Sequence, residues 1–271
     1  MIFLSPMVYK VPGVDTFWEW FERNFECSHN LPSAYKEGDY VLRYSTKGPI
    51  NARPGKSVAL CWELLPELKR VFNTNEWDGY IKATYDCAAS CDRILITSEF
   101  SRPYYEPLGK VDIMPIGVDT DLFKPMDKQE MRNKYGIPQV KEVGFWCGST
   151  HPMKGMNNVQ KYALENPDIF WVIVWYNQAG YLDLKSKQYF QVPQTQMAEL
   201  MNCADFQLSA SILRPYYIVE YEGMSCNLPQ RKILNIEKDF EAGDNPRDVI
   251  FKRQWDRHTC KKLWEKYINN L

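Results

Sequence analysis

One segment of the chain has the residue types of an anion-binding loop: Val143-Gly-Phe-Trp-Cys-Gly-Ser-Thr-His-Pro-Met-Lys-Gly155. Its apolar start predicts a strand that ends at Cys147, followed by a loop from Gly148 and a helix that begins at Lys154. A lysine at that point can place its charge against a diphosphate, while the free N–H groups of the helix N-terminus bind the same anion. The GxxxxGK[ST] spacing of a P-loop is absent. Lys154 could equally be a solvated residue at a helix start, and we expect His151 to be a loop residue rather than a catalytic base.

A second group of chemically active residues follows the apolar run 205–209. It contains Arg214, Glu220 and Glu222. An open α/β sheet forms its ligand-binding crevice at the carboxyl ends of the strands, so these side chains are candidates for a site. Residues two apart on a helix point to different sides, so only one of the two glutamates can face a crevice. A carboxylate there could accept two hydrogen bonds from a ribose diol. The alternative is a surface glutamate.

A third candidate loop lies near the N-terminus, where a predicted strand leads through residues 8–14 into a helix. The loop contains Gly13, and free N–H groups at the start of the helix could bind an anion or a hydroxyl group. A single glycine is also what an ordinary strand-to-helix turn contains, so both interpretations stay open.

Two series of short apolar runs, separated by amphipathic stretches, form the framework for these loops. Runs of this kind are typical of buried strands, and the stretches between them have the period of helices. In the first series the predicted strands are 1–4, 40–44, 58–61, 93–97 and 111–114, with helices at 16–24, 64–72, 77–91 and 102–108. In the second series the predicted strands are 143–147, 170–175 and 205–208, with helices at 157–166 and 194–203. This order predicts an α/β fold with parallel sheets covered by helices.

The two series meet in a non-periodic stretch with prolines and glycines, 115–138, and we expect the domain boundary there. Residues 1–115 and 116–250 would then form two Rossmann-like domains. Near the end of the chain, apolar residues recur at helical spacing: Trp264, Tyr267, Ile268 and Leu271. They predict a C-terminal helix within 251–271 that packs back on the first domain.

The composition excludes several classes of protein. The chain has 271 residues, 45% of them hydrophobic, and a net charge of −1. These values argue against a disordered chain and against a general nucleic-acid binder. Eight cysteines without a CxxC pair form neither a disulfide scaffold nor a zinc site, so we expect reduced thiols and a cytoplasmic protein. The apolar run 1–4 is too short for a signal peptide, and we expect no transmembrane segment.

Several motifs occur together, in a fixed order, from Asp92 onward. They are Asp92-Arg-Ile-Leu-Ile-Thr-Ser98, Met114-Pro-Ile-Gly-Val-Asp-Thr-Asp-Leu-Phe-Lys-Pro125, Gly148 with Lys154-Gly155, Ala204-Asp205-Phe206, and Glu222-Gly-Met-Ser-Cys-Asn-Leu-Pro229. With these motifs the last two-thirds of the chain resembles the retaining glycosyltransferases of the GT-B fold, especially glycosyltransferase family 4. The first third resembles the family only in its strand–helix layout.

The resemblance implies a GT-B fold, in which two Rossmann-like domains face each other across a cleft. A nucleoside-diphosphate sugar, linked to UDP or GDP, would be bound mainly by residues 116–250. Its sugar would be transferred with retention to an acceptor held by residues 1–115, which could be a saccharide, a lipid or DNA. The family needs no bound metal or other cofactor. Asp119 and Asp121 have the spacing of a metal pair, but they lie in the interdomain segment of the family, so no metal site is expected.

The resemblance also implies roles for individual residues. Lys154 would bind the donor diphosphate, with Gly148 and Ser149 beside it, and Glu222 would bind the nucleotide ribose. The backbone near Gly13 would face the acceptor or a phosphate.

Several positions depart from the family pattern. Ser149 replaces an arginine, Arg214 replaces the first of two glutamates, Pro215 and Tyr217 replace glycines, and Trp62 replaces a histidine. A guanidinium group is suited to bidentate phosphate contact, so Arg214 could supply the charge that is missing at Ser149.

Two alternatives to a saccharide- or lipid-modifying enzyme stay open. The departures would also fit a non-catalytic nucleotide-binding or interaction protein on the same fold. Some phage enzymes that glucosylate hydroxymethylated DNA bases share the GT-B fold as well. Here the basic segment 247–266 could contact DNA phosphates, and Trp255 could stack on an extruded base. The competing interpretation of the basic segment is a solvated helix face.

Overall fold

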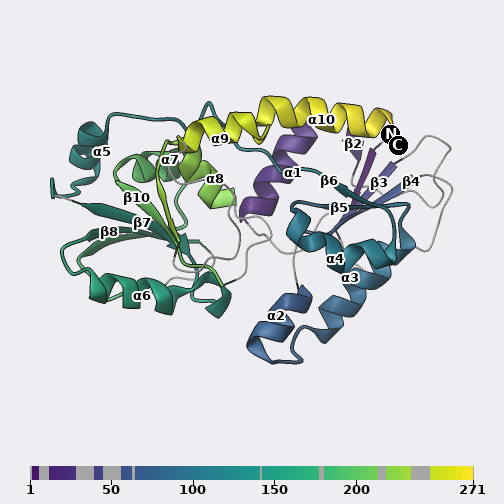
Figure 1. Ribbon diagram of the computed structural model, residues 1–271. Coiled ribbons are helices and arrows are strands. Elements are labelled where there is room, and N and C mark those ends of the chain that lie inside the picture. The colour runs from purple at the N-terminus through teal and green to yellow at the C-terminus, as the bar shows by residue number, and fades with distance from the viewer. Residues whose placement is uncertain are drawn as a thin grey trace. The chain divides into compact units, whose positions relative to one another are not determined.

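A computed structural model describes residues 2–5, 12–28, 40–44, 56–62, 65–140, 142–176, 180–212, 218–232 and 245–270. The chain divides into two compact units (Figure 1). The first unit comprises Met1–Ile116 and Cys260–Leu271, and the second comprises Gly117–Thr259. Each unit is built on one sheet, and the described strands pair in parallel.

The sheet of the first unit has the strand order β2-β1-β3-β4-β5-β6. Its strands are β1 (Ile2–Ser5), β2 (Cys27–Ser28), β3 (Tyr40–Tyr44), β4 (Lys56–Leu60), β5 (Arg93–Ile96) and β6 (Val111–Ile113). The helices are α1 (Pro12–Asn24), α2 (Leu65–Phe72), α3 (Asp78–Ser90), α4 (Arg102–Tyr105) and, from Cys260 onward, α10 (Arg257–Asn269). The chain passes from β1 to β2 on one side and then to β3 on the other. The strand order therefore reverses between β1 and β3.

Aromatic side chains fill the core of the first unit between α1, β4 and α10. The ring of Phe17 meets Trp62 edge-on, with 4.7 Å between their centroids. The ring of Phe21 meets Trp264 in the same way at 5.1 Å. All four side chains are buried. Trp62, which replaces a histidine of the family pattern, is therefore a core residue next to the carboxyl end of β4.

The sheet of the second unit has the strand order β11-β10-β7-β8-β9. Its strands are β7 (Val143–Gly148), β8 (Phe170–Trp175), β9 (Ser186–Phe190), β10 (Phe206–Ser209) and β11 (Gln230–Lys232). The helices are α5 (Lys128–Tyr135), α6 (Met156–Glu165), α7 (Gln194–Asn202), α8 (Ile218–Ser225) and α9 (Pro246–Lys252). The chain runs from β7 through β8 to β9 at one edge and returns to β10 on the other side of β7. The strand order therefore reverses between β7 and β10.

Both faces of the second sheet are covered, which explains the continuous apolar runs of its central strands. Successive side chains of β7 point to opposite faces. Phe145 and Cys147 pack in the core that includes buried residues of α7, α8 and α9. Trp146 packs on the other face with Val159 of α6 and with Trp175. Figure 1 shows α6 on one side of this sheet and α7 and α8 on the other.

The apolar runs of the sequence all form strands, but three of the described strands, and the helices α5, α8 and α9, lie outside the predicted ranges. The additional strands are β2, β9 and β11, and each lies at the edge of its sheet. An edge strand is partly exposed and can carry polar residues, so it has no continuous apolar run. The expectation that 115–138 is irregular throughout is wrong, because α5 lies within it. This helix is very polar, and of its residues only Met131 and Arg132 are buried.

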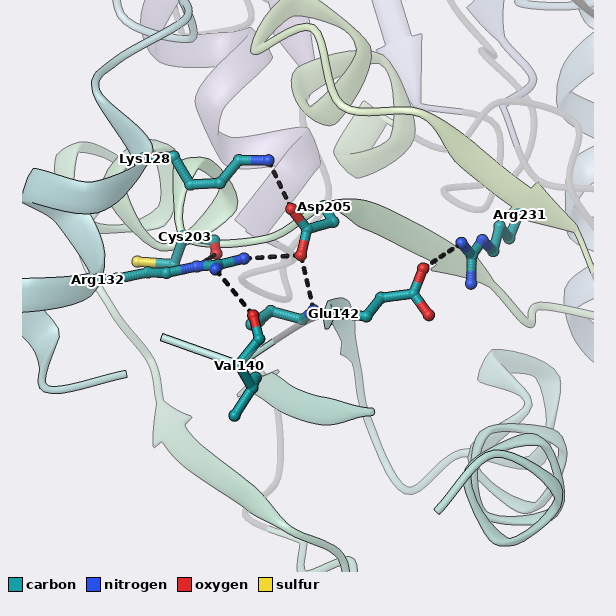
Figure 2. A network of polar contacts seen from close by, with 8 residues as sticks. Lys128, Arg132, Val140, Glu142, Cys203, Asp205 and Arg231 are labelled. Carbon is teal, nitrogen blue, oxygen red and sulfur yellow. Dashed lines mark hydrogen bonds and ion pairs between the residues drawn. The ribbon is translucent and has the colours of Figure 1, made fainter. Parts of the chain in front are cut away.

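A network of polar contacts holds α5 against the amino ends of β7 and β10 (Figure 2). The carboxylate of Asp205 accepts hydrogen bonds from Lys128 Nζ at 2.6 Å, Arg132 Nη2 at 2.7 Å and the Val143 amide at 2.8 Å. Arg132 Nε also donates to the carbonyl oxygen of Cys203 at 2.8 Å. The network thus fixes the start of two neighbouring strands, whose opposite ends carry the candidate site.

Candidate functional site

The candidate site lies at the carboxyl ends of β7 and β10, where the strand order of the second unit reverses. Gly148 is the last residue of β7, and its carbonyl oxygen accepts from the amide of Tyr176, which follows β8, at 3.1 Å. A Cβ atom on Gly148 would lie 2.3 Å from the indole ring of Trp146, so the close packing of this ring requires a glycine. Ser149 is buried, and its hydroxyl accepts from the His151 amide at 3.3 Å.

The segment after Ser149 contains a short 3-10 turn, Pro152–Lys154, which precedes α6. Gly155 joins the turn to the helix with a positive φ of 72°. The helix that was predicted from Lys154 therefore begins two residues later, at Met156. The ammonium group of Lys154 lies over the ring of Tyr176, 5.7 Å from its centroid. The lysine thus projects from the β7–α6 connection toward the end of β8.

The segment after β10 is bound directly to this turn. The Ile212 amide donates to the Met153 carbonyl oxygen at 2.9 Å. Asn158 Nδ2, in the first turn of α6, donates to the Ala210 carbonyl oxygen at 3.3 Å. These contacts bring the two loops that flank the reversal point into one structure.

Helix α8 carries both glutamates, and both are buried: Glu220 is 4% exposed and Glu222 is 6% exposed. The interpretation of Glu222 as a surface glutamate is therefore wrong. The two side chains have different neighbours. Glu220 accepts a short hydrogen bond from the Ser209 hydroxyl at the end of β10. Glu222 lies near Arg257 and Asp119, which form an ion pair of 2.9 Å between Nη1 and Oδ2.

The electrostatic setting of Glu222 is unusual for a carboxylate. Burial raises its pKa to about 7; the positive charge of Arg257 opposes the rise and the negative charge of Asp119 adds to it. Side-chain donors, by contrast, lower the pKa of Glu67 and of Glu199. Burial is therefore the main cause of the raised pKa of Glu222.

Cys147, one residue before the end of β7, connects the two halves of the site. Its thiol is buried, which raises its pKa; the charge of Glu222 raises this pKa further, and the charge of Lys154 opposes it. The charges of Glu222 and Lys154 therefore both act on one thiol. The two predicted site residues are far apart in the sequence, yet both lie within electrostatic range of Cys147.

Arg214 and Gly13 are the other predicted site residues. Arg214 lies outside the described residues. Gly13 lies in the first turn of α1, in the first unit. Asp119 pairs with Arg257, and Asp121 pairs with His258 at 3.1 Å. Across the described ranges, histidine, cysteine and acidic side chains form no group of three or more that could hold a metal ion.

Two residues proposed for DNA contact are engaged within the second unit. Arg247 donates to the carbonyl oxygens of Thr120 at 3.1 Å and Phe123 at 3.0 Å. The ring of Trp255 packs against Tyr221, with 4.4 Å between the centroids. In this arrangement neither side chain projects freely from the surface to contact a nucleic acid.

Sequence reasoning missed the structural part that His151 plays in the loop. Its Nδ1 accepts from the Met153 amide at 3.2 Å and so caps the 3-10 turn. A side-chain acceptor followed by proline is a recognisable start signal for a helical turn, because proline has no N–H that needs a partner. Histidine is an uncommon residue at such a position, so the sequence alone did not predict that His151 caps the turn.

Two further features bear on the class of protein. The eight cysteines all lie in described ranges, and each has a free thiol. Among the helices that the structure describes, none combines the length and apolar content needed to cross a membrane.

Comparisons with known proteins identify the fold. No protein-family model matches the chain. In an alignment of 136 residues that covers 45% of this chain, it is 24% identical to D-inositol 3-phosphate glycosyltransferase of Mycobacterium tuberculosis, and it spans only 28% of the length of that relative.

Solved structures match over nearly the whole chain. HepE of Anabaena, in complex with UDP-glucose, has a TM-score of 0.72 at 14% identity, covering 100% of this chain and 99% of HepE. WaaG, a glycosyltransferase involved in lipopolysaccharide biosynthesis, has a TM-score of 0.63 at 12% identity, covering 99% of this chain and 90% of WaaG. The fold is GT-B, which confirms the predicted α/β class and the resemblance carried by the motifs.

Proposed function

We propose that this protein is a glycosyltransferase whose second unit binds a nucleoside-diphosphate sugar at the carboxyl ends of β7 and β10. The observation that carries the proposal is the placement of Lys154 and Glu222. They come from opposite sides of the point where the strand order reverses, and the charges of both act on the Cys147 thiol. A cation and a carboxylate acceptor at such a point match the two ends of a nucleoside diphosphate.

The two side chains have complementary tasks in this proposal. Lys154 offsets the negative charge that develops on the diphosphate as the bond to the sugar breaks. Glu222, in its ionised form, accepts hydrogen bonds from the ribose diol. The ionised carboxylate is the stronger acceptor for the diol, so donor binding is expected to strengthen as the pH rises through about 7.

The comparisons support a UDP-linked donor as the first to test. The HepE structure holds UDP-glucose, and the curated relative is named as a glycosyltransferase. We further propose that transfer proceeds with retention and without a bound metal ion, and that Arg214 contributes a second phosphate contact. The acceptor, a saccharide or a lipid, would bind near Gly13 in the first unit. Free thiols fit a cytoplasmic site of action.

Calorimetric titration with UDP, GDP, ADP and their glucose conjugates tests donor binding directly. The expected result is binding of one nucleotide class by the wild-type chain, with slow release of the free nucleoside diphosphate from its sugar conjugate in a turnover assay. Turnover should survive excess EDTA. If none of the nucleotides binds at millimolar concentration, the proposal fails.

The alternative of a non-catalytic nucleotide-binding protein rests on Arg214 and on the glycines that Pro215 and Tyr217 replace, which depart from the family pattern. The same experiment separates the two functions. Nucleotide binding without release or transfer of the sugar, across a panel of saccharide, lipid and hydroxymethylated DNA acceptors, would favour the binding protein. Transfer to any of these acceptors would exclude it and identify the acceptor class.

A further inference from the structure

We propose that His151 is a positioning residue for donor binding, which holds the turn that carries Lys154 by means of a hydrogen-bond acceptor at Nδ1. The inference rests on the proposed role of Lys154 as a diphosphate contact. It assigns no contact with the substrate to His151 itself.

Two bonds of His151 define the start of the turn. Its Nδ1 accepts from the Met153 amide at 3.2 Å, and its carbonyl oxygen accepts from the Lys154 amide at 2.9 Å. The intervening residue, Pro152, has no amide to satisfy. His151 therefore binds the first two N–H groups of the turn, one with its side chain and one with its backbone.

The far side of the turn is held by the segment after β10. The carbonyl oxygen of Met153 accepts from the Ile212 amide at 2.9 Å. The residue directly before Lys154 thus has its amide bound to His151 and its carbonyl bound to Ile212. With both groups of Met153 engaged, the direction in which the Lys154 side chain leaves the backbone is set, and its ammonium group is placed over Tyr176. Loss of the Nδ1 bond would release one of these two constraints.

The hydrogen bond from the Met153 amide requires an acceptor atom in the side chain at position 151. An N–H donor requires a lone pair on Nδ1, so the proton of the neutral imidazole is on Nε2. Asparagine offers a carbonyl oxygen at a similar distance from the backbone and is among the best residues at this type of position. Alanine offers no acceptor. The two substitutions therefore separate the acceptor function from every other property of the histidine.

The test compares His151→Asn and His151→Ala in the full chain, with titration of UDP and steady-state kinetics at pH 8. His151→Ala is expected to weaken UDP binding and raise the donor KM about fivefold, the usual effect of one lost capping bond, with a smaller change in kcat. His151→Asn is expected to stay within about twofold of wild type. His258→Asn is the matched control, because His258 contacts Asp121 at an exposed position. Circular dichroism establishes that each variant is folded.

The possible results separate this inference from the proposed function. If His151→Ala binds UDP as wild type does, or if His151→Asn is as weak as His151→Ala, the inference is overturned. If wild type and His258→Asn bind no nucleotide, the proposed function fails instead. In that case the NMR resonances of the imidazole nitrogens at pH 8 still test the cap. The chain has only three histidines, and the resonances that disappear in His151→Asn are those of His151. A proton on Nδ1 of His151 would overturn the cap.

Discussion

The carbonyl oxygen of Ala210 lies 1.9 Å from the position that a Cβ atom on Gly155 would occupy. Gly155 also has a φ of 72°, in the region that residues with side chains rarely adopt. This contact places the start of α6 directly against the segment after β10. The two loops of the candidate site therefore depend on one residue without a side chain.

Gly155→Ala tests this dependence. The added methyl group must displace the Ala210 backbone or the start of α6, and the αL conformation adds about 1 kcal/mol of strain. We expect UDP binding to weaken at least tenfold, measured by calorimetry, together with a lower unfolding temperature. Gly79→Ala in α3 is the matched control, since no atom lies within 4 Å of its ideal Cβ position. Equal behaviour of the two variants would contradict the contact.

Lys154→Ala tests the diphosphate contact. A hydrogen bond to a charged group contributes about 1.5–3 kcal/mol, so UDP binding is expected to weaken about 10- to 100-fold. Binding of uridine, which lacks the phosphates, should not change. Lys161→Ala, on the exposed face of α6, serves as the control and should bind both compounds as wild type does. A uridine affinity that falls together with the UDP affinity would show that Lys154 supports the fold of the site rather than the phosphates.

Glu222→Gln tests the buried carboxylate through stability. The folded state holds the Glu222 proton more tightly than the unfolded state, because burial raises the pKa from 4.5 to about 7. Wild-type stability should therefore fall as the pH rises from 4.5 to about 7, by about 3 kcal/mol at most, relative to Glu222→Gln. Urea unfolding of both proteins at pH 5 and pH 8 measures the difference. Glu265→Gln, at an exposed position, should show no such change.

Ionisation of Glu222 should also control donor affinity. The affinity is expected to rise with pH, whereas the stability falls. UDP-glucose is the appropriate probe, since its diphosphate does not titrate near neutral pH. Its affinity for wild type is expected to rise as the pH passes through about 7, because the ionised carboxylate is the better acceptor for the diol. In Glu222→Gln the affinity should be lower at pH 8 and nearly independent of pH. An affinity that is unchanged in this variant would remove Glu222 from the donor site.

Asp205→Asn tests the network at the opposite end of the strands. Burial opposes ionisation of Asp205, but Lys128, the Val143 amide and Arg132 outweigh it and hold its pKa below the ordinary value. Its contribution is therefore present at neutral pH and is lost as the pH falls through the lowered pKa. We expect Asp205→Asn to lower the free energy of unfolding by about 2 kcal/mol at pH 7, with nucleotide affinity unchanged. Lys128→Ala, which removes a half-exposed partner, should lower it by less than about 1 kcal/mol.

The sequence by itself determined the central strands and the identity of the main candidate residues. The runs at β7, β8 and β10 are apolar because both faces of those strands are buried, and this signal is local. Lys154 and Glu222 were identified in the same way, from motifs that each lie within a short segment. Polar elements such as α5 and β9 gave no such signal, because few of their side chains enter the core.

Only the tertiary structure decided which of these residues meet. Asp119 and Arg257 are 138 residues apart and form an ion pair beside Glu222. The charges of Lys154 and Glu222 act on the same thiol because β10 returns to the side of β7 opposite β8. Strand order follows from how whole faces are buried against helices, and no single stretch of sequence contains that information. The raised pKa of Glu222 has the same origin, since burial depends on every segment that packs around α8.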